Sequence, residues 1–551
     1  MSLKDQGRPA KERTMEANTD RHFAEEIEAG RTSLGIELGS TRIKAILIDQ
    51  DYHTLADGDF AWENQLKDGL WTYSLEQVWE GLQGAYAALA SRVRERYGVP
   101  LTRIGAMGFS AMMHGYLAFD KADRLLVPFR TWRNTNTGQA HESLSRTFQV
   151  NIPERWSIAH LYQAVLDQEE HVPEVAFITT LAGYVHWQLS GRKVLGIGDA
   201  SGMFPIDSNN HGFDQAMLDT FDSLPEVASQ PWSIRDLLPS PLVAGEEAGS
   251  LTEAGARLLD PTGTLAAGSV MAPPEGDAGT GMVATNSVRP RTGNVSAGTS
   301  IFAMVVLEHR LEHLHPEVDP VATPAGDPAG MSHANNFTSD LNAWVGLFRD
   351  FAQAGGLRMS DDELYGTLFN LALQGDKDAG GLINYCFYSG EFLAGLEEGR
   401  PVFARGPESH MNLANFMRAQ LFSAFSPVTI GMDVMTRQEG VQVDSLVGHG
   451  GIFATPKVAQ KILAAAFDTP IRVMSTAAEG GAWGMAVLAD YLTHSDQTLA
   501  DYLDSRVFAD VESRVENPDP ADVEGFRAFF ERFSRSLPIE QAAVRSIPLE
   551  G

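Results

Sequence analysis

The sequence predicts a two-domain α/β protein in which apolar strands alternate with helices. Its 551 residues exceed the size at which a single hydrophobic core usually stops growing. A strand-turn-strand pattern at residues 35–50 reappears at residues 294–306, about half a chain later. Buried strand patterns elsewhere run into glycine-rich loops and then into helical patterns, which is typical of the α/β class. We therefore expect two related domains, one around each repeat.

Each repeat joins its two apolar strands by a turn of glycine and hydroxyl residues. These are Gly39, Ser40 and Thr41 in the first turn and Gly298, Thr299 and Ser300 in the second. Glycine adopts turn dihedral angles that a side chain disfavours, and the N–H groups of such a turn can converge on an anion such as phosphate. The alternative is that these residues serve the turn conformation alone. Two such turns favour a nucleotide site, as in an ATPase or a sugar kinase.

Composition excludes several classes of protein. The formal charge is −30 and no block of Lys and Arg occurs, so we expect no nucleic-acid partner. An acidic enzyme can still bind ATP, because Mg²⁺ and local N–H dipoles hold the phosphates. Cys386 is the single cysteine, which rules out an intrachain disulfide. Residues 1–31 are polar and are expected to be a flexible tail, and no segment approaches about eighteen continuous apolar residues, so we expect a cytoplasmic protein without a membrane partner.

Helix and strand patterns place two loops that carry candidate substrate residues. A capping box of Ser74 and Gln77 starts a helix predicted to reach about residue 97. A buried strand at residues 104–110 then opens into a loop with Met113 and His114, which is where an α/β fold usually places ligand contacts. A hydrogen-bonded core histidine is the alternative for His114.

Trp132, Arg133 and Asn134 follow in the next loop. An aromatic face beside amide and guanidinium donors suits a polyhydroxylated ligand. Trp132 can equally be a core residue. A Gly, Asp and Ser-rich loop at residues 196–202 is read as scaffold or lid.

Asp277 lies between a strand-like segment and a helical pattern, about twenty residues before the second repeat. A capping role at the helix N-terminus is the local alternative to a catalytic role. Further on, a strand at residues 446–453 enters a loop with Gly450 and Gly451. The segment at residues 477–492 predicts a helix whose Ala and Gly face can approach another backbone closely. No Walker motif occurs, so a P-loop enzyme is not expected.

Taken in order, residues 33–495 resemble the FGGY family of carbohydrate kinases, most closely its xylulokinase-like pentulose kinases. GIELGSTRIK is similar to the family's first phosphate motif, with Glu37 for Asp, Ser40 for Thr, and Lys44 at the basic position. MMHG resembles the substrate loop Gln-Met-His-Gly of xylulokinases, with Met112 in place of Gln.

Five further segments carry the resemblance. TWRNTNT is a weaker match to Trp-Asn-Asp-Gly-Arg, with Asn134 where a carboxylate is usual. GDAG is similar to the catalytic motif at Asp277, SAGTS to the second phosphate motif, and VGHGGIF to the adenosine-side Gly-Gly segment. FYSGE resembles the Leu-Ser-Gly-Glu signature, but Phe-Leu-Ala follows where Arg-Thr-Pro is usual.

The resemblance implies an actin/hexokinase-like (ribonuclease H-like) ATPase fold with mixed sheets and an interdomain cleft. The expected domains are residues 32–288 on the sugar side and 289–495 on the ATP side, with a helical extension and tail at 496–551. Kinases of this family are often dimers, so a homodimer is expected.

The resemblance also implies transfer of the ATP γ-phosphoryl group to a ketopentose, giving a 5-phosphate. Asp277 would take the hydroxyl proton, Glu37 would lie near Mg²⁺, and Lys44 and the two turns would neutralise the phosphates. D-xylulose is the first choice of substrate and L-ribulose the second. The alternatives are a kinase for glycerol, a hexulose or gluconate, an actin-fold ATPase without a sugar substrate, and a non-catalytic sugar-sensing regulator.

Overall fold

The computed structural model describes residues 10–476 and 480–548, with side chains from residue 20 onward. The described chain forms two compact units. Unit 1 contains residues 10–288, 321–327 and 480–510, and unit 2 contains residues 289–320, 328–476 and 511–548. The first passage between the units follows residue 288, where the sequence analysis places a domain boundary.

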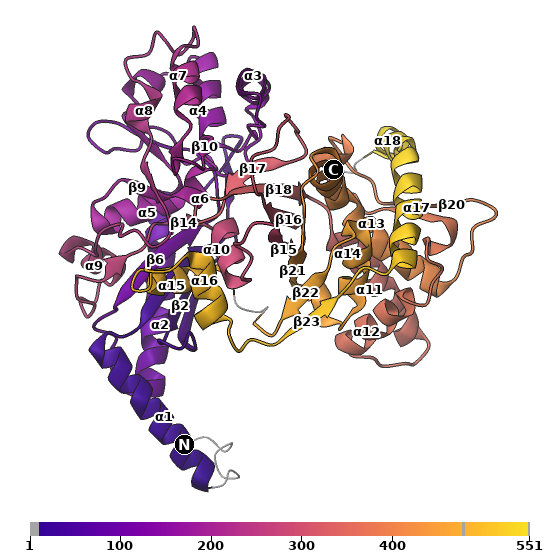
Figure 1. Cartoon of the computed structure of the whole chain (residues 1–551), viewed down its shortest axis with the longest axis horizontal. Helices are drawn as coiled ribbons and strands as arrows, with labels where there is room; N and C mark the ends of the chain where they lie inside the picture. The colour runs from indigo at the N-terminus through magenta and orange to yellow at the C-terminus, as the bar shows by residue number, and fades with distance from the viewer. Residues whose placement is uncertain (1–9, 477–479, 549–551) are drawn as a thin grey trace. The chain divides into compact units, whose positions relative to one another are not determined.

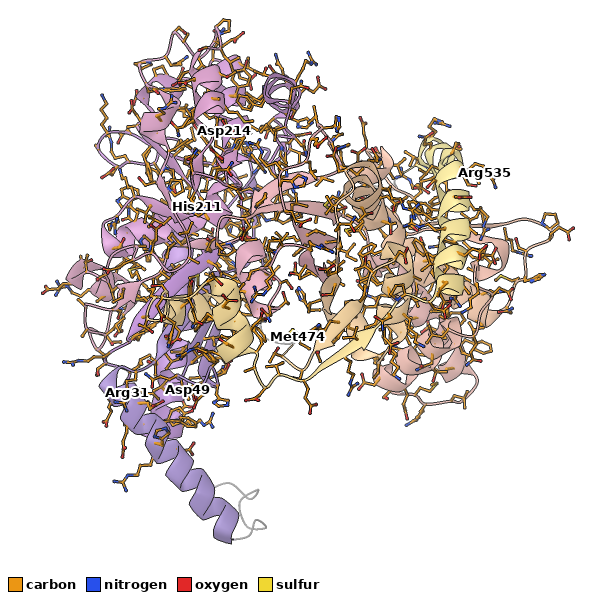
Figure 2. All side chains as sticks on the ribbon, in the orientation of Figure 1. Arg31, Asp49, His211, Asp214, Met474 and Arg535 are labelled. Atoms are coloured by element: carbon orange, nitrogen blue, oxygen red, sulfur yellow. The ribbon has the colours of Figure 1, made fainter. Side chains whose placement is uncertain are left out.

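Unit 1 is built around a mixed sheet (Figure 1). Its strands are β1 (Ser33–Leu38), β2 (Arg42–Ile48), β3 (Thr54–Ala61), β6 (Ala106–Ala111), β13 (Val270–Met271) and β14 (Glu275–Gly276). They lie in the order β13-β6-β1-β2-β3, with β14 also paired to β6. β1 is antiparallel to β2 and parallel to β6. Asp49, labelled in Figure 2, lies in the turn between β2 and β3. Its carboxylate stabilises this turn by accepting hydrogen bonds from the N–H groups of Asp51 (2.9 Å) and His53 (2.8 Å).

Helix α2 (Leu75–Tyr97) confirms the predicted amphipathic helix. Ser74 and Gln77 form the capping box, and Gly98 ends the helix in the left-handed conformation. Its buried face packs on β3, where Gly58 makes the approach feasible. A Cβ at Gly58 would lie 2.2 Å from the Ala85 carbonyl oxygen.

The helix predicted to have a small-residue face is α15 (Gly481–Tyr491), and all of its residues are buried. It packs on β1, where a Cβ at Gly35 would lie 2.0 Å from the Ala482 oxygen. It also packs on α10 (Asp277–Ala284), where a Cβ at Gly484 would lie 2.2 Å from the Thr280 oxygen. These close contacts place residues 480–510 in unit 1, whereas the second domain expected from the sequence extends to residue 495.

The segment expected to be a flexible tail is helical from Ala10 to Ala29 (α1). Ile27 is fully buried, and the Phe23 ring lies 6.1 Å from the Tyr97 ring on α2. These two apolar residues, spaced four apart, attach the helix to unit 1. Their burial explains why this segment is a packed helix and not the flexible tail that was expected. Residues 1–9 of the expected tail lie outside the described residues.

The remainder of unit 1 consists of short elements, and its second core is rich in aromatic residues. Its helices are α3 (Gly138–Phe148), α4 (Ser157–Leu166), η1 (Val172–Glu174), α5 (Leu181–Ser190), α6 (Ile197–Ala200), α7 (Gln215–Asp222), α8 (Ile234–Leu237), α9 (Glu253–Leu259), α16 (Leu499–Tyr502) and η6 (Leu503–Val507). Its short strands are β4 (Gln65–Lys67), β5 (Leu70–Thr72), β7 (Leu117–Phe119), β8 (Phe177–Thr179), β9 (Val194–Gly196), β10 (Ile206–Asp207), β11 (Gly212–Phe213) and β12 (Ser240–Leu242).

Unit 2 repeats the strand arrangement of unit 1. Its sheet has the order β17-β18-β16-β15-β21-β22-β23. The strands are β15 (Thr292–Ala297), β16 (Ile301–Val306), β17 (Asp319–Ala322), β18 (Pro328–Ala334), β21 (Ser445–His449), β22 (Ile471–Met474) and β23 (Ser513–Glu516). β15 is antiparallel to β16 and parallel to β21, as β1 is to β2 and β6. The predicted duplication is therefore present at the level of the sheet.

The helices of unit 2 surround the long, almost fully buried α13 (Leu413–Asp433). The others are α11 (Thr338–Ala354), α12 (Asp361–Ala372), η2 (Ala379–Gly381), η3 (Phe392–Ala394), η4 (Val434–Gln438), η5 (Gly451–Ala454), α14 (Val458–Phe467), α17 (Pro520–Arg535) and α18 (Leu537–Ser546). A separate two-stranded sheet pairs β19 (Leu382–Tyr385) with β20 (Val402–Arg405). Phe526, Phe529 and Phe533 of α17 are fully buried in the core of unit 2. The C-terminal segment expected to be an extension is thus part of that core.

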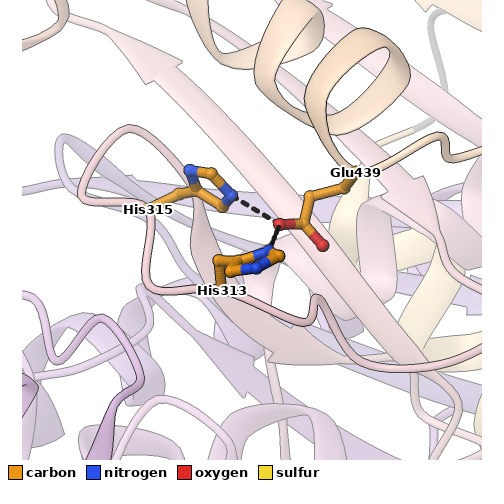
Figure 3. Close-up of side chains that lie close together, drawn as sticks. All are labelled: His313, His315 and Glu439. Atoms are coloured by element: carbon orange, nitrogen blue, oxygen red, sulfur yellow. Dashed lines mark hydrogen bonds and ion pairs between the residues drawn. The ribbon is translucent and has the colours of Figure 1, made fainter.

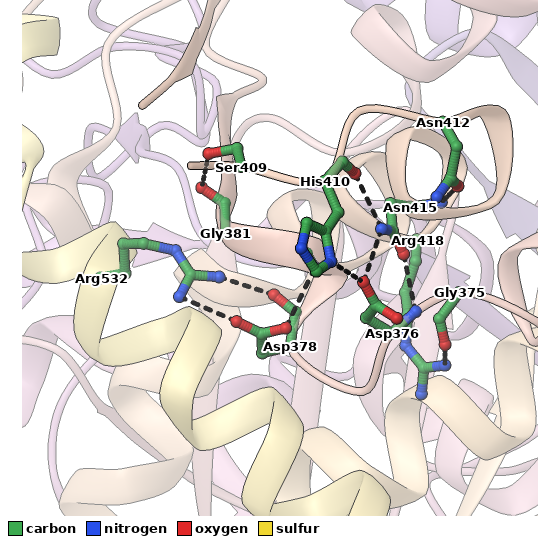
Figure 4. A network of polar contacts seen from close by, with 11 residues as sticks. Gly375, Asp376, Asp378, Gly381, Ser409, His410, Asn412, Asn415, Arg418 and Arg532 are labelled. Carbon is green, nitrogen blue, oxygen red and sulfur yellow. Dashed lines mark hydrogen bonds and ion pairs between the residues drawn. The ribbon is translucent and has the colours of Figure 1, made fainter. Parts of the chain in front are cut away.

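A polar network also attaches α17 to the rest of unit 2 (Figure 4). Arg532 donates to the carbonyl oxygen of Asp378 (2.6 Å) and to its carboxylate (3.3 Å). Arg418 of α13 donates to the Gly375 carbonyl oxygen (3.1 Å) and pairs with Asp522 of α17. The loop before η2 is therefore bonded to both helices.

Among the described residues, no helix has the length and apolarity needed to cross a membrane. Cys386 is buried, and its thiol lies 3.7 Å from the Ser423 carbonyl oxygen.

Candidate functional site

The first predicted phosphate turn connects β1 to β2 and is held from one side. The Trp62 indole N–H donates to the Gly39 carbonyl oxygen (2.7 Å), and the Tyr73 hydroxyl donates to that of Ser40 (2.5 Å). The Thr41 carbonyl oxygen accepts from the Trp62 N–H (3.2 Å). In a trans peptide the N–H points opposite to the carbonyl, so the N–H groups that follow these carbonyls point away from the two aromatic residues. Such a set of N–H groups suits an anion.

The loop after β6 is hydrogen-bonded to Asp277, which begins helix α10, as the helical pattern predicted. Asp277 is the first residue of α10, and its Oδ1 accepts from the N–H groups of Met113 (3.2 Å) and Ala278 (3.0 Å). Burial raises the pKa of Asp277 to about 6, although these N–H groups lower it. The N-cap of the helix is Gly276, so the carboxylate is not a cap, although it accepts from the N–H of the second helical residue. Its pKa is that of a group that can exchange a proton near neutral pH.

Glu37 lies near Asp277 and faces Lys44 across the hairpin. Its Oε2 accepts from the Ala482 N–H of α15 (3.1 Å). Burial and the charge of Asp277 raise the pKa of Glu37 to about 7, against the opposite effect of Lys44. Lys44 is exposed and is the partner of Glu37 in the β1–β2 register. The structure thus brings together four of the predicted features, namely the turn, Glu37, Lys44 and Asp277.

Two buried acids next to Asp277 were not identified from the sequence. Asp199 Oδ2 accepts from the Thr180 hydroxyl (2.6 Å), and Glu275 Oε2 accepts from the Asp199 N–H (3.0 Å). The pKa of each is raised to about 8, chiefly by burial, and the charge of Asp277 contributes to the rise for Asp199. Both acids therefore carry a proton at neutral pH. The pair of acids at positions 275 and 277 after a strand was the available sequence signal.

His114 has a constrained position beside this loop. It is buried in the left-handed backbone region with a φ of 71°, and Gly115 follows with a φ of 90°. Its Nδ1 lies 3.4 Å from the Gly202 carbonyl oxygen, and its ring stacks on Trp156 at a centroid distance of 6.5 Å. A non-glycine residue in this region is held there by its surroundings and often marks a functional site. Met113 and His114 therefore remain substrate candidates next to Asp277.

Asn134 has a structural role that the sequence did not predict. Its Oδ1 accepts from the Trp71 N–H (2.9 Å), and its Nδ2 donates to the carbonyl oxygens of Trp71 (2.8 Å) and Thr131 (3.0 Å). These bonds fasten its loop to β5. Trp132 is half-buried and packs against the core of unit 1, which agrees with the alternative that Trp132 is a core residue. Among the described residues, no hydrogen bond joins the Asn134 side chain to Met113, His114 or Asp277.

Unit 2 brings the other predicted nucleotide residues together. The exposed second turn closes with a hydrogen bond from the Gly298 N–H to the Ser300 carbonyl oxygen (2.9 Å), and Thr338 at the start of α11 donates to the Gly298 oxygen (2.8 Å). Gly450 has a φ of 115°, and a Cβ there would lie 2.0 Å from the Ala297 oxygen. Only glycine permits this approach, so the loop of Gly450 and Gly451 lies beside the second turn.

Two family models match most of the chain. The N-terminal domain of the FGGY family of carbohydrate kinases matches residues 32–259, and the C-terminal domain matches residues 293–492. The xylulose kinase of Haemophilus influenzae is 22% identical over 525 residues, covering 92% of this chain and 99% of that protein.

Solved structures show the same fold. The xylulose kinase of Rhodospirillum rubrum matches with a TM-score of 0.74 at 18% identity, covering 92% of this chain and 99% of that one. The gluconate kinase of Lactobacillus acidophilus matches with a TM-score of 0.72 at 15% identity, covering 93% and 98%. The chain therefore belongs to the FGGY family of carbohydrate kinases, enzymes with an actin/hexokinase-like two-domain fold.

Proposed function

We propose that this kinase transfers the γ-phosphoryl group of ATP to a primary hydroxyl of a ketopentose, giving the 5-phosphate. D-xylulose is the first choice and L-ribulose the second. One observation carries the proposal: the Met113 N–H donates to Asp277, which joins the loop expected to hold the sugar to the acid expected to take its proton. The xylulose kinase of Haemophilus influenzae, matched over 99% of its length, supports the same substrate class.

In this proposal Asp277 acts as the base. A sugar hydroxyl is a much weaker acid than a carboxylic acid, so its proton moves to Asp277 late, as the new O–P bond forms. The pKa of Asp277, raised to about 6, makes it a better proton acceptor than an ordinary aspartate while it stays mostly ionised at neutral pH. Asp199 and Glu275 remain protonated and add no negative charge beside it.

The residues near the first turn fit Mg²⁺ and the ATP phosphates. Glu37 and Asp277 repel one another, and a divalent cation with oxygen ligands would relieve that repulsion. When bound, Mg²⁺ would neutralise charge on the phosphate oxygens. Lys44 and the N–H groups of Ser40 and Thr41 would bind phosphate directly, whereas the Gly39 N–H donates to the Arg42 carbonyl oxygen and closes the turn.

In unit 2 we assign nucleotide binding to the second turn and to the neighbouring glycine loop. In the turn of Gly298, Thr299 and Ser300 the first two residues are exposed and Ser300 is half-buried, and Gly450 lets the loop with Gly451 lie against the turn. Met113 and His114 are the proposed sugar contacts. We assign Trp132 and Asn134 to the support of the substrate loop. We also propose a homodimer in the cytoplasm, where ATP and sugar phosphates are found.

The deciding experiment replaces Asp277. We expect Asp277→Asn to lower kcat for D-xylulose by about 10²–10⁴-fold while ATP still binds, because the base is lost and the shape is kept. Asp214→Asn is the matched control, since Asp214 caps α7 in the same unit and Asn is also a good cap (Figure 2). Turnover of Asp277→Asn near the wild-type value would remove Asp277 from this role.

A substrate panel tests the sugar. With ATP and Mg²⁺, we expect kcat/KM for a pentulose to exceed that for gluconate, glycerol or a hexulose by at least about tenfold, as hydrogen-bonded sites discriminate hydroxyl patterns. ADP release that is the same with and without any sugar would favour the ATPase alternative. If gluconate were the best substrate, the alternative of a gluconate kinase would be favoured. The chain is similar in fold to the gluconate kinase of Lactobacillus acidophilus.

A further inference from the structure

A cluster of two histidines and one glutamate lies in unit 2, among residues to which the proposed kinase reaction assigns no role. His313 and His315 belong to the loop of residues 307–318 between β16 and β17, and Glu439 directly follows η4 (Figure 3). His313 Nδ1 lies 2.9 Å and His315 Nε2 lies 2.6 Å from the same oxygen, Glu439 Oε1. The three ligand atoms all lie within 4.8 Å of one another.

The three side chains of the cluster differ in their exposure to solvent. The side chain of Glu439 is 3% exposed and that of His315 is 14% exposed, whereas that of His313 is 73% exposed. The second carboxylate oxygen of Glu439 accepts from the Glu312 N–H (2.7 Å), which fixes the plane of the carboxylate. A hydrogen bond to the non-ligating oxygen is how proteins orient a carboxylate ligand of a metal ion.

Both segments that carry the cluster are anchored in the core of unit 2. Leu311 packs against the core before the histidines, and Val318 is buried after them. The N–H of Glu439 donates to the Val434 carbonyl oxygen (3.1 Å), which continues the turn of η4. The three side chains are therefore positioned by the fold itself rather than by a ligand.

We propose that His313, His315 and Glu439 form a binding site for a divalent transition-metal ion of the zinc class, with water completing the coordination. Two imidazole nitrogens and one carboxylate oxygen are a donor set that Zn²⁺ accepts, whereas Mg²⁺ and Ca²⁺ prefer oxygen ligands throughout. Tetrahedral bonds of about 2.0–2.1 Å place ligand atoms about 3.3 Å apart. The separations from Glu439 Oε1 to His313 (2.9 Å) and to His315 (2.6 Å) must both open by some tenths of an ångström, the second more than the first.

The ion would replace the hydrogen bonds between the imidazoles and Glu439 and would link the 307–318 loop to the end of η4. The site is defined by residues of unit 2 alone and does not depend on the sugar or on Asp277. Zinc binding and sugar kinase activity are therefore tested by separate experiments. The competing explanation is a purely hydrogen-bonded cluster in which the imidazoles bind the carboxylate and no ion.

The test titrates ZnCl₂ into the metal-free, full-length protein by calorimetry, without Mg²⁺. The variant that decides is His313→Ala, because this side chain is exposed and its loss leaves the bond between Glu312 and Glu439 intact. His309→Ala is the matched control, since His309 lies in the same loop outside the cluster. We expect His313→Ala to weaken Zn²⁺ binding at one site by at least about tenfold, as even outer-shell changes do, and His309→Ala to leave it unchanged.

A second readout uses stability. An ion that binds the folded state raises the unfolding temperature with its concentration. We expect Zn²⁺ to raise the thermal midpoint of the wild type and of His309→Ala but not of His313→Ala or Glu439→Gln. Any shift caused by Mg²⁺ at the same concentration should be the same in all four proteins, because Mg²⁺ would bind in unit 1. Equal Zn²⁺ affinity and equal midpoint shifts in the wild type and His313→Ala would overturn the proposal, as would the absence of Zn²⁺ binding to the wild type.

Discussion

Asp277 is one of four carboxylic acids whose pKa values burial raises in the same part of unit 1. The pKa is about 6 for Asp277, about 7 for Glu37, and about 8 for both Asp199 and Glu275. Because the last two hold their protons at neutral pH, the charge of the group is carried by Glu37 and Asp277. This order of pKa values leads to two predictions.

The first prediction concerns the pH dependence of catalysis. A base must be ionised, so we expect kcat/KM for the ketose to fall as the pH is lowered through about 6, roughly two units above an ordinary aspartate. The measurement is a pH profile of kcat/KM under saturating Mg²⁺ and ATP. In Glu37→Gln the same acidic limb should remain, because it belongs to Asp277. A profile that stays flat down to pH 5 would contradict the assignment.

The second prediction concerns stability. The pKa of Asp199 rises from 3.8 to about 8 on folding, so its stabilising contribution is complete below pH 3.8 and is lost as the pH rises toward 8. Asp199→Asn cannot ionise, so its stability relative to that of the wild type should increase by about 1–3 kcal/mol between pH 5 and pH 8.5. Chemical unfolding at the two pH values measures the difference. An equal effect of the substitution at both values would show that Asp199 does not titrate in this way.

At the scale of elements, the β1–β2 turn depends on two aromatic side chains that the sequence analysis left out. Trp62 and Tyr73 stack with ring centroids 4.1 Å apart, and both donate to carbonyl oxygens of the turn. They hold the carbonyls on one side and so leave the N–H groups on the other. The affinity of the turn for phosphate should therefore depend on the Tyr73 hydroxyl, which donates to the Ser40 carbonyl oxygen.

We expect Tyr73→Phe to raise the KM for ATP by about 3–10-fold, the equivalent of one hydrogen bond of about 1 kcal/mol. The control is Tyr86→Phe, because the hydroxyl of Tyr86 is buried and has no hydrogen-bond partner among the described residues. Steady-state kinetics with varied ATP provides the measurement. If both variants show the same KM, the bond to Ser40 does not orient the turn.

At the scale of the whole molecule, the chain returns to unit 1 after most of unit 2 has been completed. Residues 480–510 supply α15, whose wholly buried residues cover β1 and β6. A fragment that ends at residue 288 therefore lacks one face of its own core, although it contains the full unit 1 sheet.

We expect the fragment of residues 1–288 to unfold without cooperativity, since removal of α15 exposes the apolar face of the sheet. Joining residues 480–510 to it by a flexible Gly-Ser linker should restore a cooperative transition. Thermal unfolding followed by near-ultraviolet circular dichroism compares the two fragments. A cooperative transition of the shorter fragment at the same temperature would show that α15 is dispensable.

Local patterns were sufficient for the hairpins, for α2 and for the position of Asp277, because each depends on neighbours in sequence: apolar periodicity, the capping box of Ser74 and Gln77, and the glycines of the turns. The family was also recognisable from short motifs. The hydrogen bonds of Asn134 and Asp199 were not predicted, because they depend on partners from 19 to 63 residues away, at Thr180 and Trp71.

The sequence by itself thus determined the α/β class, the duplicated strand pairs, the carbohydrate kinase family and the position of Asp277 at the start of a helix. Only the tertiary structure decided which carboxylic acids keep their protons, which aromatic donors hold the first turn, and to which unit α15 belongs. The physical reason is that burial, close backbone approach and hydrogen bonding between distant segments arise only when the chain is folded, whereas turn and strand preferences are local.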